Sequence, residues 1–505
     1  MKKRIYTQFI SLVMAAGIFT SCSDWLNVYP SDEIKEEYLF STGDGFRTAL
    51  NGIYRKMSTF NLYGSNLTWG IIDAWGQSYY VQKAPIAGGG KAIEKIASYK
   101  FKHSELTPTT DAMWNAAWNV VANCNNLVQQ IAVADSALFY KGEYERKMIL
   151  GEAIGLRAFM QFDLLRIYAP APSSVGYQED NRTFIPYVDT YPSYVNEHRT
   201  VVYCLEHIIR DLKQAQDILL EIDEKVNMGL DYRFGLGTNG KDLFCRARGY
   251  RLNYYAVTAE LARVYLYAGK EQEAYMEAKK LIEEEKDNGY FRASTSDYDI
   301  TNYGNMKMAK DIIFALYSPT ELVDWEHTIN YTSVSGINYY LCMRNDIANR
   351  IYGVEKEKDW RFIHQMELVD YSYYRPLKYH EQPSNKKQSE LSNQTIPMFR
   401  MSEVYYIAAE AIFATNPDEA KEYLKLVKKG RGVKELDYSN ITKKEDFIEL
   451  LVNDMQREFY GEGQILYQYK RLNRIIPAAN PYNEDTLPTD EYVVLPLPDS
   501  EASIN

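Results

Sequence analysis

Apolar residues recur along this chain at intervals of three and four, which is the period of a helix with one buried face. Phe46, Leu50 and Met57, for example, fall on one side of a helix. This pattern predicts helices over 46–57, 111–131, 143–168, 200–222, 442–459 and 465–475. Asp111 and Thr200 are expected to begin two of them, because their side-chain oxygens can accept hydrogen bonds from N–H groups of a first turn.

Two predicted helix hairpins resemble each other. The first joins 252–268 to 271–285, and the second joins 400–413 to 417–428. Their apolar positions correspond at a constant offset: Ala262, Ala274, Ala278 and Leu281 match Ala408, Ala420, Leu424 and Val427. Small residues let two antiparallel helices approach closely, as in a tetratricopeptide unit. Two unrelated helix pairs are the alternative, since Ala at helical spacing is common.

Long segments without a helical period interrupt these helices, near 61–110, over 173–199 and over 287–398. Stretches of this length in a compact protein are usually functional or carry small elements of their own. We expect those near 61–110 and 287–398 to be inserts on one domain that spans 22–505.

The first residues have the pattern of an export signal. Lys2, Lys3 and Arg4 precede an apolar stretch that is too short to span a bilayer, and Cys22 follows small residues. This pattern resembles a bacterial lipobox, so we expect a signal peptide over 1–21 and a lipid on Cys22 that holds the chain on the surface of the outer membrane. An ordinary signal peptide with a chance cysteine is the alternative.

Composition narrows the function further. The formal charge of −11 and the lack of a long basic run argue against nucleic acid as a partner. The four later cysteines form no CxxC pair, and we expect buried free thiols.

The Gly235–Gly240 stretch matches GxGxxG but follows a poor strand, so it indicates a loop. We predict no catalytic residue, metal or cofactor, although the carboxylates of a surface glycosidase cannot be recognised without geometry.

Several motifs occur in a fixed order along the chain. They are Ala49-Leu50-Asn51-Gly52-Ile53-Tyr54; Trp114 to Ile131 with Asn123 and Asn126; Gly151-Glu152-Ala153 through Leu156-Arg157-Ala158-Phe159, Phe162-Asp163-Leu164 and Tyr168; Arg199-Thr200-Val201 with Asp211-Leu212 and Ala215; Glu403, Tyr405 and Ala408-Ala409-Glu410-Ala411; Arg457-Glu458 with Glu462-Gly463; and Leu495-Pro496-Leu497-Pro498. In this order, behind a lipobox, they resemble the SusD/RagB family of outer-membrane nutrient-uptake lipoproteins of Bacteroidetes. The chain departs from the family pattern at Ile465, Gln468 and Tyr469, where an Arg and an Asp-Leu are usual, and at Ala169, where Gly is common.

The resemblance implies an all-α fold, in which tetratricopeptide-like helix pairs form a right-handed superhelical core with long irregular inserts. It also implies a SusC-like TonB-dependent transporter as partner, on which such proteins sit as a lid. Family members capture oligosaccharides or peptides and deliver them to that barrel. We expect oligosaccharides here, with peptides in the same role as the alternative, and a helical-repeat adhesion or scaffold protein as a third possibility.

Two groups of loop residues are predicted to bind the ligand. By alignment with the family, both fall in segments that commonly line the ligand face. Aromatic rings stack on the C–H faces of sugars, and amides and carboxylates bind hydroxyl groups. Loop packing is the alternative for each ring. The residues are Trp69, Asp73, Trp75, Tyr79 and Tyr80 in the first group, and Trp325, Asn338, Tyr339 and Tyr340 in the second.

Overall fold

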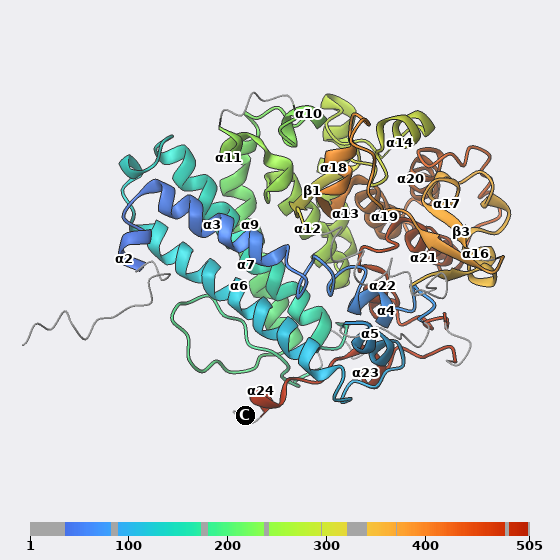
Figure 1. The fold of residues 1–505 in the computed structure, drawn as a ribbon, viewed down its shortest axis with the longest axis horizontal. Coiled ribbons are helices and arrows are strands. Elements are labelled where there is room, and N and C mark those ends of the chain that lie inside the picture. Colours follow the sequence, from blue (N-terminus) through green and yellow to red (C-terminus); the bar gives the residue numbers. More distant parts are fainter. Residues whose placement is uncertain are drawn as a thin grey trace, which may run out of the picture.

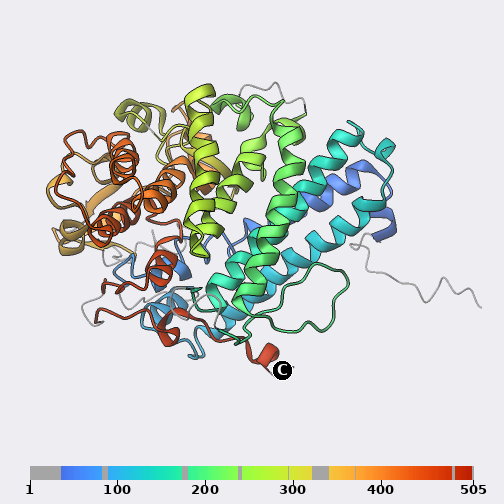
Figure 2. The same ribbon diagram turned by 180° about the vertical axis from the view of Figure 1, so that it is seen from behind.

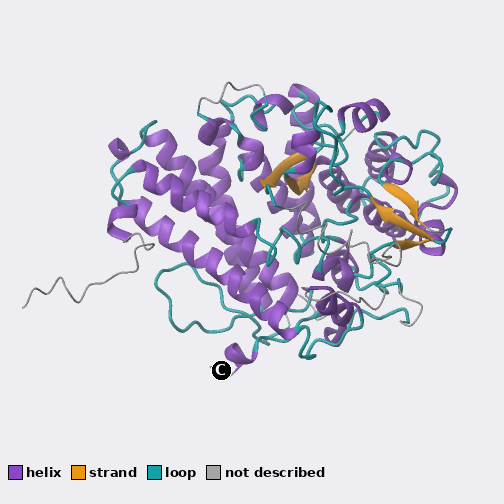
Figure 3. Ribbon diagram, viewed as in Figure 1, coloured by secondary structure: helices purple, strands orange, loops and turns teal. Residues whose placement is uncertain are grey.

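Long helices make up most of the fold (Figure 3). The computed structural model describes residues 36–81, 89–172, 180–236, 242–293, 295–320, 341–369, 371–479 and 484–502. The predicted signal peptide, Cys22 and most of the Gly235–Gly240 loop lie outside these residues.

The N-terminal half is a layer of long helices that pack side by side (Figure 1). They are α3 (Gly43–Met57), α6 (Thr107–Val133), α7 (Glu143–Tyr168) and α9 (Val201–Asp223), and α2 (Glu36–Leu39) precedes them. Because α7 contacts α3, α6, α9 and α12, its residues 151–168 are all buried. Thr200 begins α9 as predicted, and its Oγ1 accepts a hydrogen bond from the Tyr203 N–H. The prediction for Asp111 was wrong: α6 begins one turn earlier, with a proline in its first turn.

Both predicted hairpins are present. The first pairs α12 (Tyr254–Tyr267) with α13 (Glu271–Asn288), and the second pairs α19 (Met401–Ile412) with α20 (Pro417–Lys429). All eight corresponding small or aliphatic residues are buried, and α13 also packs against α19. The green and yellow-green helices α9, α12 and α13 stand next to one another in the view from behind (Figure 2). The expectation of a helical core built from tetratricopeptide-like pairs is therefore confirmed.

Two small antiparallel sheets interrupt the helices in the second half. Strand β1 (Ile312–Tyr317) pairs with β5 (Thr395–Arg400), and β4 (Tyr373–Pro376) lies between β2 (Met343–Arg344) and β3 (Met366–Val369). The remaining elements are α4 (Ile71–Trp75), α5 (Gly89–Ala97), η2 (Ser136–Leu138), α10 (Leu230–Arg233), α11 (Leu243–Arg246), η3 (Arg248–Tyr250), α14 (Asp297–Tyr303), α16 (Asn345–Tyr352), η4 (Gly353–Glu355), α17 (Trp360–Ile363), α18 (Ser389–Asn393), α21 (Lys444–Glu458), α22 (Ile465–Arg471), α23 (Asp490–Val493) and α24 (Asp499–Ala502).

One apolar cluster extends from Phe46 to Leu495 and joins both halves. Cys124, Cys204, Cys245 and Cys342 are buried free thiols, as expected. None of the helices in the described part of the chain is both long enough and apolar enough to cross a bilayer.

Several motif residues are buried charges on α7 that hold neighbouring helices. Glu152 accepts hydrogen bonds from Arg248 and from the Tyr54 hydroxyl, the latter at 2.6 Å. Arg157 pairs with Asp211 of α9, Nη2 to Oδ2, at 2.5 Å. A buried carboxylate or guanidinium is tolerated only when it is paired in this way. The motif is therefore explained by packing between helices.

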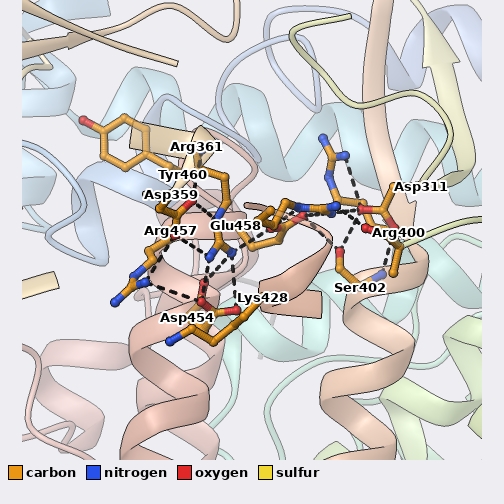
Figure 4. A network of polar contacts seen from close by, with 12 residues as sticks. Asp311, Asp359, Arg361, Arg400, Ser402, Lys428, Asp454, Arg457, Glu458 and Tyr460 are labelled. Atoms are coloured by element: carbon orange, nitrogen blue, oxygen red, sulfur yellow. Dashed lines mark hydrogen bonds and ion pairs between the residues drawn. The ribbon is translucent and has the colours of Figure 1, made fainter. Parts of the chain in front are cut away.

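A larger network of buried charges organises the second half (Figure 4). Arg361 lies between Asp359, Asp454 and Glu458, at 2.7, 2.7 and 2.9 Å. Among the described residues, ion pairs connect equal numbers of basic and acidic side chains, namely Arg361, Lys378, Arg400, Lys428, Arg431 and Arg457 with Asp311, Glu355, Asp359, Asp454, Glu458 and Glu462. The network therefore joins helices, strands and loops that are distant in the sequence.

Candidate functional site

The end of the first predicted ligand segment lies against the small sheet β2–β4–β3. The Tyr80 N–H donates a hydrogen bond of 2.7 Å to the carbonyl of Cys342, and the two residues form an antiparallel bridge. Cys342 directly precedes β2 and follows the second predicted group, which ends at Tyr340. Two segments separated by more than half of the chain are therefore joined at one sheet edge.

A stacked pair of tyrosines lies at this edge. The ring centroids of Tyr80 and Tyr373 are 5.3 Å apart and their planes are 28° from parallel. Both side chains are partly exposed. Tyr373 is the first residue of β4, where it pairs with Arg344 of β2 and Val369 of β3. Because β4 is the central strand, the position of the Tyr373 backbone is fixed from both sides.

A separate aromatic and basic group lies beside β4, on the opposite face of the sheet, because successive residues of a strand point to opposite faces. The ring of Tyr374 packs against Phe362 with centroids 4.8 Å apart. The Lys356 ammonium lies 4.8 Å from the Phe362 ring centroid and 4.6 Å from that of Tyr374. Tyr371, at the turn before β4, is 92% exposed. Tyr373 was not among the candidate ligand residues predicted from the sequence, although three tyrosines within four positions, 371–374, were a usable signal.

Most of the first predicted group is buried, which contradicts a direct role in ligand contact. Trp69, Asp73, Trp75 and Tyr79 are each 0% exposed. The Trp75 Nε1–H donates to the carbonyl of Tyr492 at 2.6 Å, and its ring packs edge-on against Phe101. The consecutive turns of 58–70 and the short helix α4 place these rings inside the protein. Only Tyr80 of this group lies at the surface edge.

Asp73 instead holds the short helix α4 against the turn that contains Gly461 and Gly463. Its Oδ2 accepts a hydrogen bond from the Gly461 N–H at 2.7 Å, and its Oδ1 accepts one from the Gly463 N–H at 3.1 Å. Burial raises the pKa of Asp73 to about 8, although the Gly461 N–H acts in the opposite direction. Gly463 has a φ of +69°, and a Cβ there would lie 2.1 Å from the Leu67 carbonyl oxygen. This contact fixes the segment that leads to Tyr80.

The second predicted group, Trp325, Asn338, Tyr339 and Tyr340, lies outside the described residues. Its role in ligand binding stays a prediction, as does lipidation of Cys22.

Stacked and edge-on tyrosines offer flat apolar faces with hydroxyl groups, which suit ligands with both apolar and polar sides. Within the described ranges, no three His, Cys, Asp or Glu side chains are grouped to hold a metal ion.

Comparison with known proteins supports one family over both halves of the chain. The model of the SusD family matches residues 330–501, and a related model described as "Starch-binding associating with outer membrane" matches residues 25–230. SusD-like protein P38 of Formosa agariphila is 20% identical, over 98% of this chain and 96% of its own length.

Solved structures show the same fold. A SusD-like carbohydrate binding protein from Bacteroides vulgatus superimposes with a TM-score of 0.67 at 18% identity, covering 92% of this chain and 96% of the other. A laminarin binding SusD-like protein gives a TM-score of 0.63 at 14% identity, covering 91% of this chain and 97% of the other. The paired helices, the two family models and these structural neighbours agree, and the chain belongs to the SusD/RagB family.

Proposed function

We propose that this protein captures oligosaccharides at the cell surface and passes them to a SusC-like TonB-dependent transporter in the outer membrane. It acts by binding, without catalysis. A lipid on Cys22 anchors it, so that the domain faces the outside of the cell.

The observation that carries this proposal is the stacked Tyr80–Tyr373 pair at the edge of the β2–β4–β3 sheet. Sugar rings have apolar faces that pack on aromatic rings, and both tyrosines are partly exposed. Two structural neighbours are described as carbohydrate and laminarin binding proteins, which supports glycans over peptides as the ligand class.

The test is binding of the purified chain from residue 23 onward, without lipid, to matched pools of oligosaccharides and peptides, read by native mass spectrometry and calorimetry. We expect retention of an oligosaccharide. The double variant Tyr80→Ala/Tyr373→Ala should weaken that binding at least about tenfold, which corresponds to about 1.4 kcal/mol.

Tyr140→Ala is the matched control, because Tyr140 is 82% exposed and lies in a separate loop beside η2. The affinity of the Tyr140→Ala variant for the oligosaccharide should equal that of the wild type. Retention of peptides alone would replace the glycan by a peptide in the same role. Retention of neither pool would contradict capture of a soluble nutrient.

The partner is tested separately with the full-length, lipidated chain. We expect a TonB-dependent barrel to co-purify with it from outer membranes solubilised in mild detergent. Purification of the chain alone, from membranes that contain such barrels, would contradict the proposed partner.

A further inference from the structure

A groove lies between helix α6 and the loop 186–196, away from the Tyr80–Tyr373 pair. Its volume is about 510 Å³, and Glu501 of α24 contributes to its lining. Figure 1 shows this loop below α6, whereas α16, α17 and β3 lie at the opposite end of the molecule. Cavities of about 300–1,000 Å³ are typical of small-molecule sites.

The groove is held open by buried hydrogen bonds at the base of its loop. Gln161 of α7 binds both backbone groups of Val188: its Nε2 donates to the carbonyl at 3.2 Å, and its Oε1 accepts from the N–H at 2.7 Å. The Asn125 Nδ2 donates to the carbonyls of Val188 and Thr190 at 3.1 and 3.3 Å. Arg157 reaches the carbonyl of Asp189 at 3.4 Å. The loop is therefore fixed to α6 and α7 by hydrogen bonds within the protein.

Aromatic rings occupy both walls. On α6, the partly exposed ring of Trp118 packs edge-on against Trp114, with centroids 5.5 Å apart. Trp114 is itself held by Tyr168 at 4.8 Å, so the Trp118 ring cannot turn freely. Across the groove, Tyr191 is 36% exposed and Tyr194 is 89% exposed. Exposed aromatic side chains that face a groove lose little conformational entropy on binding, because they have only two rotatable bonds.

The lining indicates the chemistry of the ligand. Of the described residues that line the groove, only Glu501 carries a charge, and its Oε1 lies within hydrogen-bond distance of the His198 Nε2, at 3.2 Å. Hydroxyl and amide groups of Thr190, Ser193 and Asn196 stand beside the aromatic rings. A lining whose one charge is a carboxylate, with no cation beside it, disfavours anionic sugars and peptide carboxylates, whereas rings with hydroxyl and amide groups suit a neutral sugar.

We propose that this groove is a second binding site for neutral oligosaccharides, with Trp118 and Tyr194 as its ring contacts. The inference rests on the proposed function for the class of ligand, but it concerns a separate surface. Two sites on one chain would let a surface protein hold a long glycan at two points, which raises the overall affinity through the high effective concentration of the second contact.

The test uses the lipid-free chain and neutral hexasaccharides derived from laminarin, starch, cellulose and mannan. Calorimetry gives the number of sites, and hydrogen exchange locates them. We expect two molecules bound for each chain, with exchange in residues 186–196 slowed by the sugar. Tyr191→Ala/Tyr194→Ala should remove one site and leave the other unchanged. Tyr194→Phe should keep both sites, because the ring remains, and Tyr140→Ala is the exposure-matched control.

The outcomes separate the two proposals. The groove proposal is overturned if Tyr80→Ala/Tyr373→Ala loses all sugar binding and the sugar does not slow hydrogen exchange in residues 186–196 of the wild type. The proposed function then still stands. Binding that survives in that variant but is lost in Tyr191→Ala/Tyr194→Ala supports the groove and overturns the role of the stacked pair. Failure of the wild type to bind any of the four hexasaccharides, when a peptide pool does bind, overturns both glycan assignments.

Discussion

Replacing Glu458 by glutamine would remove one negative charge from the centre of the buried network (Figure 4). Its Oε2 accepts from Arg361 Nη1 at 2.9 Å and from Arg431 Nε at 3.0 Å. Its Oε1 accepts from Arg431 Nη2 at 2.5 Å and from the Ser402 hydroxyl at 3.1 Å. All of these side chains are buried.

The expected loss follows from these contacts. Glutamine can replace one acceptor oxygen but places an NH₂ group against a guanidinium, so at least one of the two arginines loses its charged partner there. Arg361 keeps Asp359 and Asp454, and Arg431 keeps Asp311, which limits the damage. Removing one partner from a buried ion pair costs about 3–5 kcal/mol. We therefore expect Glu458→Gln to lower the free energy of unfolding by about 3 kcal/mol, at the lower end of that range.

Equilibrium unfolding in urea, followed by far-ultraviolet circular dichroism, measures this loss. Glu422→Gln is the matched control, because Glu422 pairs with Lys425 at 2.7 Å but is 62% exposed. Its cost should be below about 1 kcal/mol, as for other surface pairs. Equal midpoints for the two variants would refute the argument that the network is stabilised by its balance of charges.

Three further outcomes follow from single residues. Gly463→Ala should lower the free energy of unfolding by about 2–4 kcal/mol, because the backbone there has a positive φ and the new Cβ would meet the Leu67 carbonyl oxygen. Gly52→Ala is the control, since a Cβ there meets nothing within 4 Å, and it should change that free energy by less than about 1 kcal/mol. Urea titration measures both variants. Burial raises the pKa of Asp454, but the charges of Arg361, Lys428 and Arg457 together outweigh it, so that the pKa falls to about 2. Because this value is below the ordinary 3.8, its stabilisation is present above about pH 4 and lost as the pH falls towards 2, and Asp454→Asn should flatten that part of the acid-unfolding curve. The pKa of Asp73 is raised to about 8, so the wild type should lose stability as the pH rises from about 4 to 8. In thermal unfolding, the melting temperature of Asp73→Asn relative to the wild type should therefore be higher at about pH 9 than at about pH 5. The same difference in melting temperature at both pH values would contradict this pKa.

The sequence by itself determined the helices and their pairing. Apolar spacing located α7 and both hairpins to within a few residues, since a helix with a buried face needs that period wherever it lies. The correspondence between Ala262 and Ala408 gave the repeat, because only a small residue fits where two helices approach closely. The positions of Cys124 and Cys204 within apolar helical patterns predicted buried free thiols, which the structure shows.

The tertiary structure decided which aromatic rings face the solvent. Trp75 and Tyr80 occur in the same irregular segment, and composition does not distinguish them. Trp75 is enclosed because α4 turns it towards Phe101 and Tyr492, whereas Tyr80 meets β4 at a sheet edge. Burial of an irregular segment depends on contacts hundreds of residues away, and no local period records them. The same holds for Asp73, whose partners Gly461 and Gly463 come from the far end of the chain.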